Sequence, residues 1–239
     1  MARAVHAVFF DMGGTLRYRI QDPEMRAQGL SDLKRALAYE GSPETLFALL
    51  KERAGEYKAW SQETLTEAPE EELWTRWMWP EGDAERIRKT AVTLEHYWRA
   101  TQGRRVARPD AKRVVDTLHR RGYAMGIISN TTSREAVPRA LVEYGLEQYF
   151  SVVVLSSTCG HRKPGKEIFQ IAVQKLGVAP DDCAYVGDRP SRDVLGAKSA
   201  GFSLSVLIRD EMVEFHEPLG DSLEPDHTIR GLAPLLNIL

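Results

Sequence analysis

Polar and charged residues occur at four places along the chain, each shortly after a predicted buried strand. A single aspartate or serine in such a position is usually a turn or helix-capping residue. Ligands of parallel α/β proteins bind at the carboxyl ends of the strands, so four such groups at one sheet edge predict a binding or catalytic site. The residues are Asp11, the pair Ser129 and Asn130, Lys163, Asp188 and Asp193.

The chemistry that this set favours is phosphoryl transfer. A carboxylate such as Asp11 can attack phosphorus and form an aspartyl-phosphate, which divides one difficult step into two easier ones. The carboxylates of Asp11, Asp188 and Asp193 would repel one another without a hard cation, and Mg²⁺ prefers oxygen ligands and bridges to phosphate. Lys163 would offset negative charge, while Ser129 and backbone N–H groups would bind the phosphoryl oxygens.

Five short apolar runs predict the strands that would position these residues. The first, residues 5–10, is rich in β-branched and aromatic side chains, as expected of a buried parallel strand. Predicted helices alternate with the later strands, which indicates an α/β fold with a Rossmann-like, doubly wound parallel sheet. The other predicted strands are 123–128, 152–155, 183–186 and 203–208, and the helices between them are 111–121, 134–144, 167–176 and 193–200.

A different pattern fills residues 22–100. Leucines recur there at helical spacing, no convincing strand is present, and all five tryptophans fall in this stretch. We therefore expect an inserted α-helical module with its own aromatic core. The acidic run at residues 67–72 is interpreted as a solvated loop and helix start, and the acidic tail at residues 211–226 as a loop.

The four places carry motifs that resemble those of the haloacid-dehalogenase-like (HAD) hydrolases with a helical cap. They are DMGGTL at residues 11–16, IISN at 127–130, RKP at 162–164 and GDRPSRD at 187–193. The motifs come in the family's order, and the helical stretch stands at the family's cap position. The resemblance implies a HAD-like α/β core domain at residues 1–16 and 104–239 and a helical cap domain at residues 17–103.

The resemblance also implies a role for each residue, with a small phosphorylated molecule as the substrate. Asp11 would be the nucleophile, and Lys163 would assist it as the second catalytic residue. The Mg²⁺ ligands would be Asp11, the backbone carbonyl of Gly13, Asp188 and Asp193. The substrate contacts would be Ser129, Asn130, Gly14, Thr15 and Arg17.

The sequence departs from the family's phosphatases at Gly13. These enzymes usually carry a second aspartate at this position, which protonates the leaving alcohol and later activates water. Positioned general acid–base catalysis contributes about 10²–10⁴-fold. The absence of this aspartate leaves three possibilities open. The leaving group needs no proton, a residue of the cap supplies the proton, or the protein no longer turns over efficiently. His161, two residues before Lys163, is a weak candidate for the replacement donor.

Two alternatives to a phosphatase therefore stay open. One is a catalytically impaired relative that binds phosphate ligands or a protein partner. The other is a metal-independent, dehalogenase-like hydrolase. The retained acidic pair Asp188 and Asp193 argues for a metal and so places dehalogenation lower.

Arg17 and Arg19 lie at the predicted hinge into the cap. They are interpreted either as solvated side chains or as a clamp on a second charged group of the substrate.

Composition excludes several other classes of protein. Lys and Arg number 32 against 34 Asp and Glu, and the formal net charge of −2 disfavours binding along a nucleic-acid backbone. No run approaches the roughly 20 apolar residues of a membrane-spanning helix, and the N-terminal apolar stretch is too short for a signal segment. The two cysteines, Cys159 and Cys183, exclude a disulfide framework and fit a reducing compartment, so we expect a cytoplasmic location.

Overall fold

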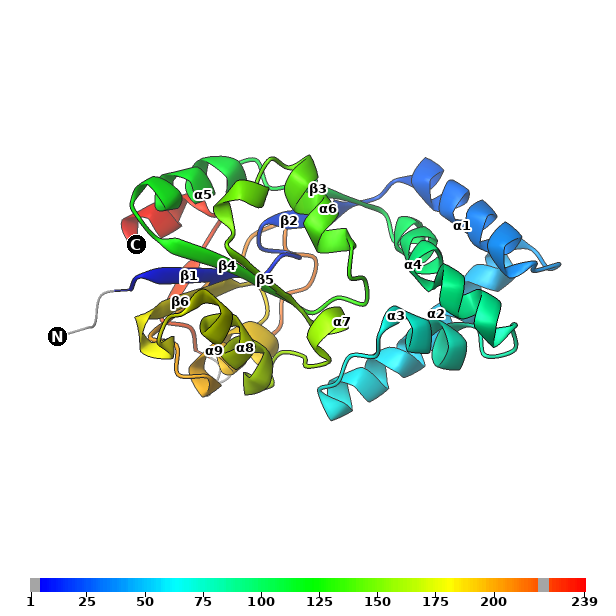
Figure 1. The fold of residues 1–239 in the computed structure, drawn as a ribbon. Helices are drawn as coiled ribbons and strands as arrows, with labels where there is room; N and C mark the ends of the chain where they lie inside the picture. The colour runs from blue at the N-terminus through cyan, green and yellow to red at the C-terminus, as the bar shows by residue number, and fades with distance from the viewer. Residues whose placement is uncertain (1–4, 219–223) are drawn as a thin grey trace.

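The computed structural model describes residues 5–218 and 224–239 and confirms the predicted α/β core. Six parallel strands form one sheet in the order β5-β4-β1-β6-β7-β8 (Figure 1). The strands are β1 Ala7–Phe10, β4 Ala124–Ser129, β5 Val152–Leu155, β6 Cys183–Gly187, β7 Leu204–Ile208 and β8 His227–Ile229.

Helices cover both faces of this sheet, which explains the continuous apolar run of β1. Val8 and Phe10 pack into the cluster on the side of α5 (Ala111–Arg120) and α6 (Ala136–Glu143), whereas Ala7 and Phe9 pack toward α8 (Lys166–Leu176) and α9 (Leu195–Ser199). A strand that is buried on both faces has no polar alternation. The remaining core elements are α7 Ser156–Cys159, η2 Glu147–Tyr149, η3 Pro180–Asp182, η4 Pro190–Val194 and η6 Ala233–Asn237.

The stretch without predicted strands forms the helical unit, α1–α4, to one side of the sheet (Figure 1). Two of its helices begin at Ser42 and Asp83, whose side chains accept hydrogen bonds from the backbone N–H groups of Thr45 and Arg86. The tryptophans form or border its apolar core, as expected, with Trp74 fully buried. The elements are α1 Pro23–Leu37, α2 Pro43–Thr64, α3 Glu70–Glu72, η1 Leu73–Met78 and α4 Ala84–Thr101.

A two-stranded antiparallel ribbon joins the helical unit to the sheet. It consists of β2 (Arg17–Ile20) and β3 (Arg104–Ala107), with Arg17 opposite Ala107 and Ile20 opposite Arg104. The domain boundaries expected from the sequence, before residue 17 and after residue 103, coincide with the starts of these two strands. Neither strand was predicted, because two four-residue segments rich in arginine show no apolar pattern.

A helix starts within residues 67–72, at Glu70, as predicted, but the interpretation of this run as solvated is wrong. Glu67 and Glu70 are almost fully buried between the helical unit and the core. Glu67 accepts hydrogen bonds from Ser156 and Arg162, and Glu70 pairs with Arg134. Partners distant in sequence compensate the burial of these carboxylates, which composition alone cannot reveal.

The tail also differs from its expectation. His227–Ile229 adds the edge strand β8, which follows the last strand that the sequence predicts, 203–208. Three residues are too few to give a periodic signal. Part of the predicted loop 211–226, residues 219–223, lies outside the described residues.

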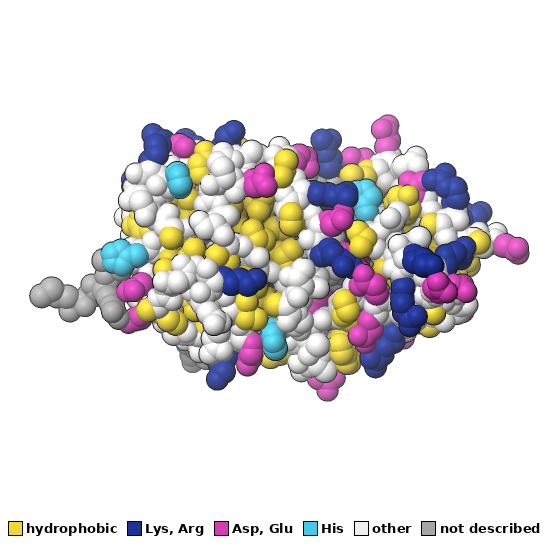
Figure 2. Space-filling view, in the orientation of Figure 1, with side chains coloured by type: hydrophobic (Ala, Val, Ile, Leu, Met, Phe, Trp, Pro, Cys, Tyr) yellow, Lys and Arg dark blue, Asp and Glu magenta, His cyan; other side chains and the backbone are white. Residues whose placement is uncertain are grey.

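Charges of both signs are interspersed on the face drawn in Figure 2, including the surface of the helical unit. Within residues 5–218 and 224–239, no helix has the length and apolar character needed to cross a bilayer.

Candidate active site

Asp11 directly follows β1 and lies at the carboxyl end of the sheet. Its backbone N–H donates to the Val186 carbonyl at 2.9 Å, which continues the pairing of β1 with β6. The side chain is buried, and Lys163 Nζ lies 2.7 Å from Asp11 Oδ1. The two residues are 152 positions apart in sequence, so the fold alone brings this ion pair together.

The Lys163 ammonium joins two carboxylates inside the protein. Its Nζ lies 2.7 Å from Asp11 Oδ1, 2.7 Å from Asp193 Oδ1, 2.7 Å from Tyr185 Oη and 3.0 Å from the Ile128 carbonyl. Burial of an ammonium is costly unless it is paired and hydrogen-bonded. These partners meet that condition, and they fix the separation of Asp11 and Asp193.

Asn130 holds the backbone of Lys163. Its Nδ2 donates to the Lys163 carbonyl at 2.9 Å, and its Oδ1 accepts from the Lys163 N–H at 2.9 Å. Both polar ends of this amide are therefore engaged by the loop that carries the lysine. The geometry gives Asn130 a positioning task, although it was expected to contact substrate.

Asp193 is held in its ionised form. Burial by itself would raise the pKa of this carboxyl. The charges of Lys163 and Arg192 outweigh that effect, so the net pKa lies below the usual value of an aspartate. Its Oδ2 also accepts hydrogen bonds from the backbone N–H groups of Asp188 at 3.2 Å and Arg189 at 2.9 Å. These contacts fasten the turn after β6.

Asp188 is the least compensated carboxylate of the site. Burial, followed by the charges of Asp11 and Asp193, raises its pKa to about 8. Its Oδ1 is buried and has no hydrogen-bond partner among the described residues. Arg192 lies 3.7 Å from Oδ1, and Arg189 lies 3.5 Å from Oδ2. The Asp188 carboxylate thus has unused capacity to bind a cation.

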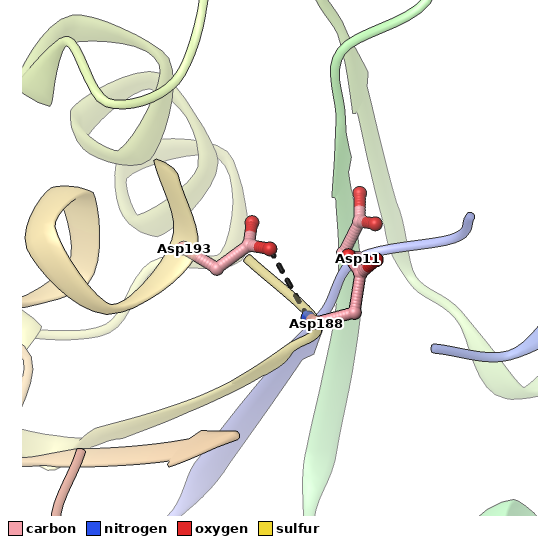
Figure 3. A group of neighbouring side chains, drawn as sticks. All are labelled: Asp11, Asp188 and Asp193. Atoms are coloured by element: carbon pink, nitrogen blue, oxygen red, sulfur yellow. Dashed lines mark hydrogen bonds between the residues drawn. The ribbon is translucent and has the colours of Figure 1, made fainter. Parts of the chain in front are cut away.

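The three carboxylates converge from the residue after β1, from the residue after β6 and from η4 (Figure 3). One oxygen of each lies within 4.8 Å of the others. Oxygen ligands at this spacing suit a hard divalent cation, which would relieve their mutual repulsion. The residues that could hold a metal are therefore Asp11, Asp188 and Asp193, with Gly13 at the same end of the sheet.

Gly14 makes the close approach of the first and fourth motifs possible. It has a φ of +79°, and a Cβ built on it would lie 2.3 Å from Asp188 Oδ2. Its carbonyl accepts a hydrogen bond from Arg108 at 2.8 Å, and Arg108 is itself paired with Asp210 at 2.7 Å. Its N–H donates to the Arg17 carbonyl at 2.7 Å, so this N–H already has a partner inside the protein.

Gly13 lies in open space. A Cβ built at this position meets no atom of the described residues within 4 Å, and the backbone is not in the left-handed region. The residue is exposed and lines the pocket. The backbone at position 13 therefore leaves room for a side chain.

A pocket of about 250 Å³ opens in front of these residues. Of the expected substrate contacts, Gly14, Arg17, Ser129 and Asn130 line it. Thr15 does not line this pocket: it is fully buried, and its hydroxyl has no hydrogen-bond partner among the described residues. His161 is exposed in a loop beside Thr66 and does not line the pocket either.

Four residues of this region escaped the sequence analysis. Tyr185 contacts Lys163 from within β6, and its phenol looked like part of an apolar strand. Arg108 braces the Gly14 loop, and Arg99 and Arg105 line the pocket. The role of an arginine outside any motif cannot be predicted from the sequence, because the residues that it contacts are distant in sequence.

Comparison with known proteins identifies a protein family and relatives that are named as phosphatases. A family model described as haloacid dehalogenase-like hydrolase matches residues 5–201. A phosphoserine phosphatase of Thermus thermophilus is 29% identical over 81% of this chain and 85% of its own length. A glyceraldehyde 3-phosphate phosphatase of Methanopyrus kandleri is 35% identical, and that match spans 55% of either chain.

Solved structures of similar fold include a phosphatase and a dehalogenase. A HAD phosphatase from Thermococcus onnurineus has a TM-score of 0.62 at 26% identity, covering 98% of this chain and 97% of that one. A 2-haloacid dehalogenase from Pseudomonas syringae has a TM-score of 0.70 at 19% identity over the same shares, a likeness of fold alone.

Proposed function

Because this chain belongs to the haloacid dehalogenase-like hydrolases, we propose that it is a Mg²⁺-dependent phosphatase with Asp11 as its nucleophile. The substrate would be a small phosphorylated metabolite. The observation that carries the proposal is the buried contact of Lys163 with Asp11 beside Asp188, one buried oxygen of which has no hydrogen-bond partner among the described residues. Relatives named as phosphatases, such as those of phosphoserine and phosphoglycolate, support the same reaction class.

The donor set fits Mg²⁺. Asp188 has a buried oxygen with no hydrogen-bond partner among the described residues, and one oxygen from each of three carboxylates lies within 4.8 Å of the others. Asp11, Asp188 and Asp193, with the Gly13 carbonyl, would hold the ion. When bound, Mg²⁺ would neutralise carboxylate and phosphate charge and orient the phosphoryl group.

Asp11 would act in two steps. Lys163 engages Oδ1, which leaves Oδ2 to attack phosphorus. The bond to the leaving oxygen breaks, its electron pair stays on that oxygen, and an aspartyl-phosphate forms. Water then attacks phosphorus, which regenerates the Asp11 carboxylate and releases inorganic phosphate. Lys163 and Ser129 would stabilise negative charge through both steps.

Gly13 determines which leaving groups depart readily. Besides Asp11 and Asp188, Glu214 is the carboxylate among the described lining residues, and it is paired with Arg19. Without a positioned acid, the leaving oxygen must depart as an anion or take its proton from water. We therefore expect acyl and aryl phosphates to react faster than alkyl phosphates.

The helical unit would serve as the cap of the site. Arg99 of α4 lines the same pocket as Asp11, so closure of the unit would exclude water and select the substrate. We also infer a cytoplasmic protein without a nucleic-acid partner, from two unpaired cysteines and a formal net charge of −2.

A second candidate function rests on Gly13. This candidate is a relative that binds phosphorylated ligands without turning them over. Such a protein does not need the acid that Gly13 replaces. A metal-independent, dehalogenase-like hydrolase is the third candidate, and the buried Asp188 oxygen that has no hydrogen-bond partner among the described residues disfavours it.

The proposal is tested with acyl, aryl, alkyl phosphates and haloacids, each with Mg²⁺ and with a chelator. We expect phosphate release that requires Mg²⁺ and that falls by about 10³-fold or more in Asp11→Asn. Asp116→Asn on α5 is the matched control and keeps the parent rate. Halide release that a chelator leaves unchanged would support dehalogenation, and ligand binding without any turnover would support the second candidate.

A further inference from the structure

Three arginines from separate segments line the pocket that contains Asp11. Arg17 begins β2, Arg105 belongs to β3, and Arg99 lies near the end of α4. The hinge ribbon and the helical unit thus both contribute positive charge to the wall of this pocket. Lys163 is buried beside Asp11, so these guanidiniums form a second, separate group of cations.

No described carboxylate forms an ion pair with these three side chains. Arg17 donates to the Ala136 carbonyl at 3.2 Å, and Arg105 donates to the carbonyls of Arg99 and Gly103, each at 3.2 Å. The neighbouring Arg19, by contrast, is paired with Glu214. Carbonyl partners satisfy only part of a guanidinium, which has five N–H donors.

The three charges also repel one another. Burial lowers the pKa of Arg17 to about 10 and that of Arg105 to about 9, and in both cases the next cause is the charge of Arg99. Both remain protonated at neutral pH. Glu95 and Glu70 offset part of the Arg99 charge from a distance, but no described carboxylate is in ion-pair contact with the three guanidiniums, so the pocket wall carries positive charge. An anion placed among the three would remove this repulsion and supply the missing acceptors.

We propose that Arg17, Arg99 and Arg105 bind a second anionic group of the substrate, a carboxylate or a second phosphate on the leaving portion. This inference rests on the proposed phosphatase function and names its substrate class. Guanidiniums match the planar geometry of carboxylates and the oxygens of phosphate. A substrate with its phosphoryl group at Asp11 would then present its other charge to the arginines.

The kinetic test compares substrates that differ only in the second charge. 4-Carboxyphenyl phosphate and its neutral carboxamide have similar aryl leaving groups, so their comparison isolates the second charge. We expect kcat/KM to favour the carboxylate by about 10- to 100-fold. That ratio should approach one in Arg99→Met and Arg105→Met. Arg88→Met, an exposed position on the same helix as Arg99, should keep the parent ratio.

Binding separates this inference from the proposed function. In Asp11→Asn, calorimetry would measure the dissociation constants of the same aryl pair and of phosphoglycolate with its amide. The carboxylates should bind at least about tenfold more tightly, and Arg99→Met should remove the difference. Equal affinity for the carboxylate and the amide, or a preference that survives both arginine variants, would overturn the subsite. Absence of turnover in the parent protein, with the binding preference intact, would instead overturn the phosphatase.

Discussion

Single residues set the charge of the site. Lys163 compensates Asp11 and Asp193, but Asp188 keeps a buried oxygen without a hydrogen-bond partner. Loss of one partner of a buried charged network leaves the others uncompensated. This imbalance at Asp188 makes a cation the simplest occupant of the space between the carboxylates.

At Gly13, one substitution tests the missing acid. The site has room for a side chain, so Gly13→Asp should fold normally and supply a proton to the leaving oxygen. We expect kcat/KM for an alkyl phosphate to rise by about 10²-fold or more, and the rate for an aryl phosphate to change much less. Gly13→Asn, which has the same shape without the acid, should bring no gain. An equal gain in Asn and Asp variants would show that acid catalysis is not what position 13 lacks.

At the scale of elements, α4 connects the helical unit to both the pocket and the core. Arg99 lines the pocket, and Glu95, one turn earlier, accepts a hydrogen bond from Thr132 at 2.5 Å. Glu95 is fully buried and also accepts from Trp74 Nε1 at 3.3 Å. Burial, opposed by Arg99 and these hydrogen bonds, raises its pKa from 4.5 to about 7.

This shift predicts how stability depends on pH. Between pH 4.5 and 7 the folded protein retains the Glu95 proton that the unfolded chain releases, so the contribution of Glu95 falls as pH rises through this range. Across this pH range, the free energy of unfolding that Glu95 contributes falls by about 3 kcal/mol. In urea unfolding, Glu95→Gln should lose less stability between pH 5 and pH 8 than the parent protein.

Glu85→Gln is the control for this measurement, because Glu85 is exposed on the same helix. It should follow the pH dependence of the parent. If Glu95→Gln also followed it, Glu95 would not hold its proton in the folded protein.

The fold and the site differ in how far the sequence could predict them. The buried runs of β1, β4, β5, β6 and β7 are visible because helices cover both faces of the sheet. The motif residues follow those strands, so their common edge could be predicted. The hinge ribbon and β8 could not, because three or four residues carry no periodic signal.

Long-range compensation was invisible in the sequence for a different reason. Glu67 and Glu70 looked solvated, yet partners in the core allow them to be buried. Asn130 and Thr15 belonged to motifs, but the structure uses Asn130 to hold Lys163 and buries Thr15 away from the pocket. A residue type and its spacing do not reveal which atoms the fold has already engaged.

At the scale of the whole molecule, segments remote in sequence meet at one end of the sheet, and the helical unit completes the pocket wall. The central claim is that Asp11 attacks phosphorus in this pocket. It can be tested in a single turnover with an aryl phosphate in H₂¹⁸O, followed by acid quench and mass spectrometry of both products.

We expect a transient phosphoryl group on the peptide that contains Asp11, ¹⁸O in the released phosphate and none in the Asp11 carboxylate, because water attacks phosphorus. Label in the Asp11 carboxylate would indicate attack on the carboxyl carbon, as in an ester intermediate. That result, or turnover without any modified Asp11 peptide, would contradict the account.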